Sequence, residues 1–165
     1  MFATNHVLAG ADIGIASEKP WSAFMAGALS HLAMDSTPHT LLPLSYPESK
    51  KYRIAEADGL LGLAVGTGCL LYARKEFGFN AMVTTGSGIL GAVVFDAEKP
   101  WQYFTGRRLF PTRITNGLSA IQQETPKGVW VEAAATAVLA AGFVAAVMFR
   151  RKKEKMKARQ RELLG

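Results

Sequence analysis

Five stretches of this chain are apolar and almost free of charge, and polar or proline-containing segments separate them. Three of these stretches extend over about 15 to 22 residues with at most one charged side chain, which approaches the length that crosses a bilayer core. A soluble chain of 165 residues rarely holds three such segments. The pattern predicts helices over residues 5–16, 20–35, 52–73, 79–96 and 128–149.

Prolines and short polar turns mark the expected ends of these helices. Pro20 suits the first position of the second helix, and Pro38 disfavours helical backbone in the residue before it. The turn over 74–78 is so short that the third and fourth helices should be antiparallel neighbours. Residues 101–127 form the longest expected connection.

The predicted fold is all-α, a multi-pass transmembrane bundle of about five helices. One helical domain covers residues 1–149, and a basic tail covers 150–165. Small residues recur at the spacing that lets helices pack closely in lipid, as in Gly10-x-x-x-Gly14 and Gly62-x-x-x-Gly66. A water-soluble bundle of buried, alanine-rich helices is the alternative, because a buried core helix is also apolar on all sides.

The net charge of +6 is concentrated in the tail, where residues 150–161 contain eight Lys or Arg residues. Basic residues close to the end of a span favour the cytoplasmic side, so we expect a cytoplasmic C-terminus. Anionic lipid headgroups account for such a cluster, and no nucleic-acid partner is expected. The single cysteine, Cys69, excludes a disulfide within the chain.

All three histidines lie in the first 39 residues, and two of them flank an aspartate. His31 and Asp35 are i,i+4 neighbours on one helix face, and His39 follows the helix end. Threading the five helices through a membrane brings the ionisable ends of four helices to one side. The alternative is that charged residues simply mark helix ends at an interface, although Lys and Arg would be the commoner choice there.

Imidazole and carboxylate groups suit Zn²⁺ or another divalent ion, including Mn²⁺ or Mg²⁺. Such an ion can lower the pKa of bound water and activate it against an ester or phosphate. No catalytic side chain is assigned. The expected ligands are His6, His31, Asp35 and His39, with Asp58 and Asp96 completing a second ion or orienting the imidazoles.

Residues 1–11 (MFATNHVLAGA) and 28–39 (ALSHLAMDSTPH) resemble the opening of a family of bacterial inner-membrane metal-dependent hydrolases. The family has LexA-regulated members and is distantly similar to zinc-dependent phospholipase C. Asp58 and Asp96 fall where the family's later acidic positions are expected. The resemblance implies a bacterial inner-membrane location and metal-dependent hydrolysis.

The chain also departs from the family pattern. Val94-Phe95-Asp96 stands where members often have Leu-Pro-Asp, and no histidine follows His39. A non-catalytic membrane subunit that binds a protein partner therefore remains an alternative to a hydrolase. A third alternative is a small carrier or proton pathway that uses Asp12, Glu56 and Asp58.

Overall fold

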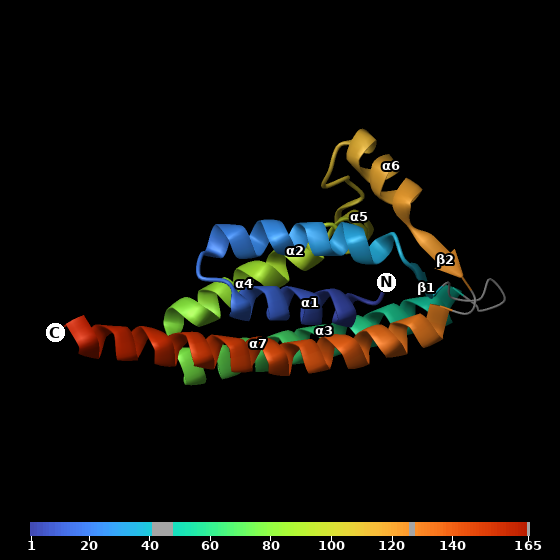
Figure 1. The fold of residues 1–165 in the computed structure, drawn as a ribbon. Helices are drawn as coiled ribbons and strands as arrows, with labels where there is room; N and C mark the ends of the chain where they lie inside the picture. Colours follow the sequence, from blue (N-terminus) through green and yellow to red (C-terminus); the bar gives the residue numbers. More distant parts are fainter. Residues whose placement is uncertain (41–47, 126–127, 165) are drawn as a thin grey trace.

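The computed structural model describes residues 1–40, 48–125 and 128–164, and within these ranges the chain is almost entirely helical (Figure 1). The all-α prediction is confirmed. Two short strands, β1 (Pro38–Thr40) and β2 (Gln123–Thr125), pair in parallel and so hold together two distant parts of the chain. The helices are α1 (Ala3–Ala16), α2 (Pro20–Asp35), α3 (Glu48–Phe77), α4 (Phe79–Val93), α5 (Glu98–Thr105), α6 (Thr112–Ile121) and α7 (Gly128–Leu164).

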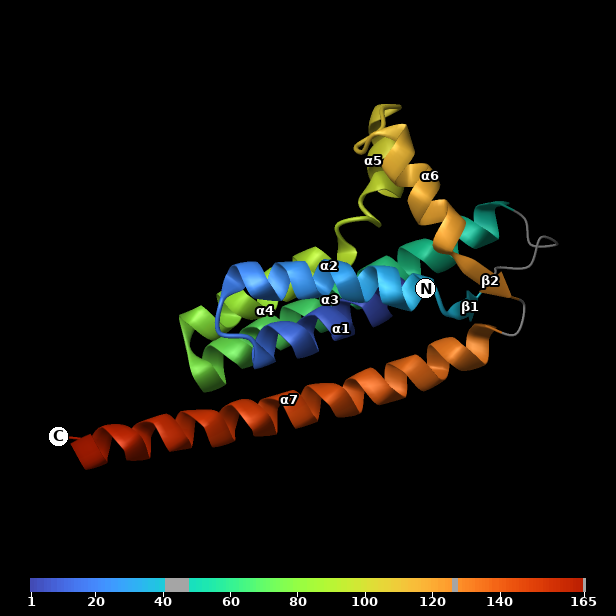
Figure 2. The same cartoon turned by 45° about the horizontal axis from the view of Figure 1, so that its top comes forward.

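Helices α1, α2 and α4 pack closely against one another, and α1 also contacts α3 and α7 (Figures 1 and 2). Glycines make this close packing possible. A Cβ atom added to Gly10, Gly88 or Gly91 would approach backbone atoms of a neighbouring helix to less than 3.0 Å. Backbones therefore meet where larger side chains would hold them apart.

The expected connection over residues 101–127 contains most of α5 and all of α6, two helices that the five-helix prediction did not include. These helices were missed because they are short and their apolar residues alternate with polar ones. A criterion of long uncharged stretches does not detect such amphipathic helices.

The last helix is longer than expected: α7 continues from the apolar stretch through the predicted tail to Leu164. No Gly or Pro interrupts residues 150–164, and Lys, Arg, Glu and Met are good helix formers. Glu18, in the α1–α2 connection, lies 3.0 Å from Lys153 and 2.6 Å from Lys157. These two ammonium groups lower the pKa of the Glu18 carboxyl to about 2.

Two helices, α3 and α7, are long and apolar enough to cross a membrane. Their apolar windows are only 17% and 11% buried, whereas the core helix of a soluble protein is mostly buried. Helices α1, α2 and α4, with 14, 16 and 15 residues, are shorter than the usual spanning length. The outer faces of α2 and α4 nevertheless expose large apolar side chains, among them Trp21, Leu29 and Leu90.

Candidate metal centre

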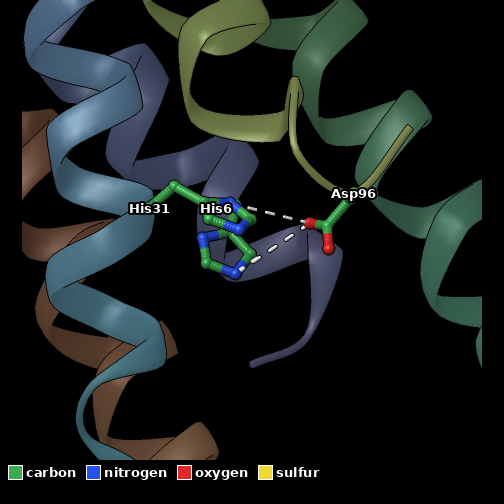
Figure 3. A group of neighbouring side chains, drawn as sticks. All are labelled: His6, His31 and Asp96. Carbon is green, nitrogen blue, oxygen red and sulfur yellow. Dashed lines mark ion pairs between the residues drawn. The ribbon is translucent and has the colours of Figure 1, made fainter. Parts of the chain in front are cut away.

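His6 and His31 are stacked at one end of the bundle, with ring centroids 4.1 Å apart (Figure 3). His6 comes from α1 and His31 from α2, and both side chains are buried. The two helices can approach closely here because both pack against the glycine-rich α4. Imidazoles from different helices thus meet where both are almost fully buried.

The tautomer of His31 follows from its backbone partner. Nδ1 of His31 lies 2.7 Å from the carbonyl oxygen of Ala92, which can only accept a hydrogen bond. Nδ1 therefore carries the proton and donates, and in the neutral ring the lone pair is on Nε2. Metal-binding histidines commonly have this arrangement, since a backbone carbonyl orients the ring while the other nitrogen binds the ion.

Asp35, at the last position of α2, contacts both histidines. Its Oδ1 is 3.2 Å from Nε2 of His6, and its Oδ2 is 3.3 Å from Nε2 of His31. Ligand atoms around a tetrahedral Zn²⁺ ion are also about 3.3 Å apart. The Met1 amino nitrogen and Nε2 of Gln122 also contact this carboxylate, at 3.0 Å and 3.1 Å.

Asp96 approaches the histidines from the turn after α4 (Figure 3). Its Oδ2 lies 4.0 Å from Nε2 of His6 and 3.9 Å from Nδ1 of His31. His6, His31 and Asp96 form a group whose ligand atoms all lie within 4.8 Å of one another, so the group could hold a metal ion.

Three polar atoms of this group have no hydrogen-bond partner among the described residues: both ring nitrogens of His6 and Oδ2 of Asp96. The contact from His6 to Asp35 has an ion-pair distance but not the direction of a hydrogen bond. Leaving a buried polar group without a partner costs about 1–3 kcal/mol. A divalent ion would satisfy one ring nitrogen of His6 and Oδ2 of Asp96, which makes the cluster the strongest candidate metal site among the residues that the structure describes.

Asp58 contacts the amino end of α1. Its Oδ2 accepts a hydrogen bond from the backbone N–H of Ala3 at 2.6 Å, and its Oδ1 accepts one from the hydroxyl of Thr4 at 2.7 Å. Glu132, on α7, accepts hydrogen bonds from the N–H of Phe2 and, at 2.7 Å, from Nδ2 of Asn5. These two carboxylates cap the amino end of α1, the helix that carries His6.

His39 lies in β1, where Nδ1 of its buried side chain donates to the carbonyl of Thr37 at 2.9 Å. No contact joins His39 to His6, His31, Asp35 or Asp96 among the residues that the structure describes. The structure thus brings together four of the six expected ligands. Asp58 and His39 make other contacts.

The roles of Asn5, Ala92, Gln122 and Glu132 were missed in the sequence. Each acts through a contact with a residue far away along the chain, and nothing local distinguishes it. Glu132 alone gave a signal, as the one charged residue in the apolar stretch of residues 128–149. A carboxylate in such a stretch is costly unless it has a partner.

Replacing Asp58 with alanine should destabilise the protein by roughly 1–2 kcal/mol, because two backbone N–H groups and the Thr4 hydroxyl lose an acceptor. Thermal unfolding in detergent would measure this as a lower Tm. Glu56→Ala is the matched control, since Glu56 is exposed two residues earlier on the same helix. Equal effects of the two substitutions would contradict the capping role of Asp58.

Comparison of this chain with protein-family models, with curated proteins and with solved structures finds no match in any of the three. A function for this chain must therefore be argued from its fold and from the arrangement of the His/Asp cluster.

Proposed function

We propose that this chain is a multi-pass integral membrane protein with a divalent metal site at one end of its helical bundle. The first support is the exposure of the two long apolar helices. Leu60, Leu63, Leu71, Val138 and Val144 are each more than half exposed, a pattern expected of faces in contact with lipid. If the bundle were in water, these apolar side chains would be exposed to solvent, whereas in a membrane lipid covers them.

The distribution of charge supports the same proposal. Arg151 of α7 pairs with Glu76 at the end of α3, and Glu18 pairs with Lys153 and Lys157. The connections at this end and the α7 tail therefore form one strongly basic face, opposite the end that carries the His/Asp cluster. The positive-inside rule then gives a cytoplasmic tail and a metal site at the outer face of the membrane.

Washing membranes with alkaline carbonate should leave the protein in the pellet, because its apolar faces are embedded in lipid. A fluorescent protein fused to the C-terminus should be fluorescent, and alkaline phosphatase fused there should be inactive. Release into the supernatant would contradict the membrane proposal. An active phosphatase fusion would contradict only the orientation.

The cluster supports a metal-dependent hydrolase, and the observation that carries this proposal is the set of buried, unpartnered atoms on His6 and Asp96. The nitrogens of His6 and His31 and one carboxylate oxygen, from Asp35 or Asp96, would hold the ion and leave its fourth position open for water. A bound Zn²⁺ ion supplies a water of lowered pKa. The Ala92 carbonyl orients His31, and the caps on α1 hold His6 in place. The resemblance to bacterial inner-membrane hydrolases is consistent with this proposal.

Elemental analysis of the purified protein tests the metal site, and hydrolysis of bis(p-nitrophenyl) phosphate tests the activity. We expect about one divalent ion per chain and a hydrolysis rate that falls on chelation and returns with metal. Metal content at background would contradict both parts of the proposal.

A second candidate is a non-catalytic subunit that binds a protein partner in the membrane. It is favoured by the contacts that Asp35 already makes with the Met1 nitrogen and Gln122, which compete with an ion for the carboxylate. Bound metal without hydrolysis, together with a partner recovered from detergent-solubilised membranes, would favour this candidate.

A further inference from the structure

A cavity of about 250 Å³ lies between the His/Asp cluster and helices α5 and α6. Its lining includes His31 and Asp96 of the cluster together with Arg108, Thr115 and Gln122. The cavity is smaller than the pockets that enclose drug-sized ligands, about 300–1,000 Å³. The cavity has room for a chemical group about the size of a lipid headgroup, which would reach the candidate metal ligands from the side of α5 and α6.

Arg108 is the only Arg or Lys among the described residues that line this cavity. Its Nη1 donates to the hydroxyl of Thr115 at 3.2 Å, which connects the guanidinium to α6. A guanidinium has five N–H donors, so donors remain for a ligand. Guanidinium groups match the oxygens of phosphate in geometry and charge.

The segment that carries Arg108 is held by specific contacts. Oε2 of Glu98 accepts hydrogen bonds from the N–H groups of Leu109 at 2.8 Å and Phe110 at 3.0 Å. Gly106 ends α5 with a φ of 67°, a backbone conformation that favours glycine. Phe110 packs on Phe95, which in turn contacts His31.

From this geometry we propose that Arg108 binds an oxyanionic group of the phosphate class, which the metal centre contacts at the same time. The inference rests on the proposed metal centre. Arginine and a divalent ion together stabilise the charge on phosphoryl oxygens in many enzymes. Arg108 thereby selects ligands that carry this group.

The charges around the cavity make anion binding dependent on the ion. Two carboxylates, from Asp96 and Glu98, outweigh the single guanidinium of Arg108 when no ion is bound. A divalent cation reverses that balance, so phosphate should enter only the metal-loaded protein.

The test uses the full chain in detergent, loaded with Mn²⁺, and measures how bound Mn²⁺ accelerates the ³¹P relaxation of inorganic phosphate. We expect saturable relaxation enhancement in the wild type and none after chelation. Arg108→Gln should weaken phosphate binding about 10- to 100-fold and leave Mn²⁺ affinity unchanged, because only a charged hydrogen-bond donor is lost. Arg107→Gln is the matched control, since its exposed side chain does not line the cavity.

Phosphate binding that is equal in Arg108→Gln and the wild type would overturn this inference and leave the metal centre intact. A wild-type protein that binds no Mn²⁺ would overturn both. Competition with dihexanoyl phosphatidic acid identifies the source of the phosphate group. If this lipid displaces bound phosphate at a lower concentration than unlabelled phosphate does, the natural ligand is a lipid headgroup. If it displaces phosphate equally well or less well, the natural ligand is a water-soluble phosphate compound.

Discussion

Replacing His6 with alanine is expected to weaken divalent metal binding by at least about 100-fold. Substitutions that only disturb the orientation of a ligand already cost 10- to 100-fold in affinity, so loss of a ligand atom should cost more. Both ring nitrogens of His6 lack a hydrogen-bond partner among the described residues, so alanine removes the ligand without breaking a hydrogen bond. Calorimetric titration of the metal-free protein with Zn²⁺ measures the change.

His39→Ala is the matched control for this experiment. His39 is also buried, but unlike His6 it has a hydrogen-bond partner, the carbonyl of Thr37, which lies outside the cluster. We expect it to retain wild-type metal affinity even where its stability changes. If both substitutions weaken binding equally, the ligand assignment drawn from the geometry is wrong.

Gly88→Ala should destabilise the bundle by about 1–3 kcal/mol or more, because the packed helices cannot accommodate even one added methyl group. A Cβ atom at Gly88 would lie less than 3.0 Å from backbone atoms of Gly10 and Gly14 on α1. The substitution should separate α4 from α1 and so displace His6. A lower Tm in detergent and weaker metal binding would both report this change.

Gly68→Ala provides the control for Gly88→Ala. No heavy atom lies within 4 Å of a Cβ atom added at Gly68, although this residue is also a glycine within an apolar helix. Within a helix, alanine is more favourable than glycine by about 1 kcal/mol, so the Tm of this variant should equal that of the wild type or be slightly higher. A similar loss of stability in both variants would show that helix packing is not the cause.

The sequence alone determined where the principal helices lie. Apolar stretches bounded by Pro20, by the turn over 74–78 and by the residues before Gly128 correspond to α1, α2, α3, α4 and α7. It also indicated that His6, His31, Asp35 and Asp96 share one end of the bundle, because consecutive helices joined by short connections alternate in direction. These inferences depend on local periodicity and chain order, which a sequence contains directly.

Only the tertiary structure decided which side chains meet. Asp58 and His39 were expected beside the metal, yet Asp58 caps α1 and His39 bonds to Thr37. Arg150 also stabilises the packing of α7 against α1. Its Nη1 donates hydrogen bonds to the carbonyl oxygens of Ile15 and Ser17 at the other end of α1.

Such contacts depend on the rotation of each helix about its axis and on how closely the backbones approach. In this protein both are set by a few glycines on α1, α2 and α4. A change of a few ångströms there decides whether a carboxylate such as that of Asp58 reaches the His/Asp cluster or a helix end. Helix periodicity gives the face on which a residue lies but not the neighbour that this face meets, so the site could be anticipated only in part.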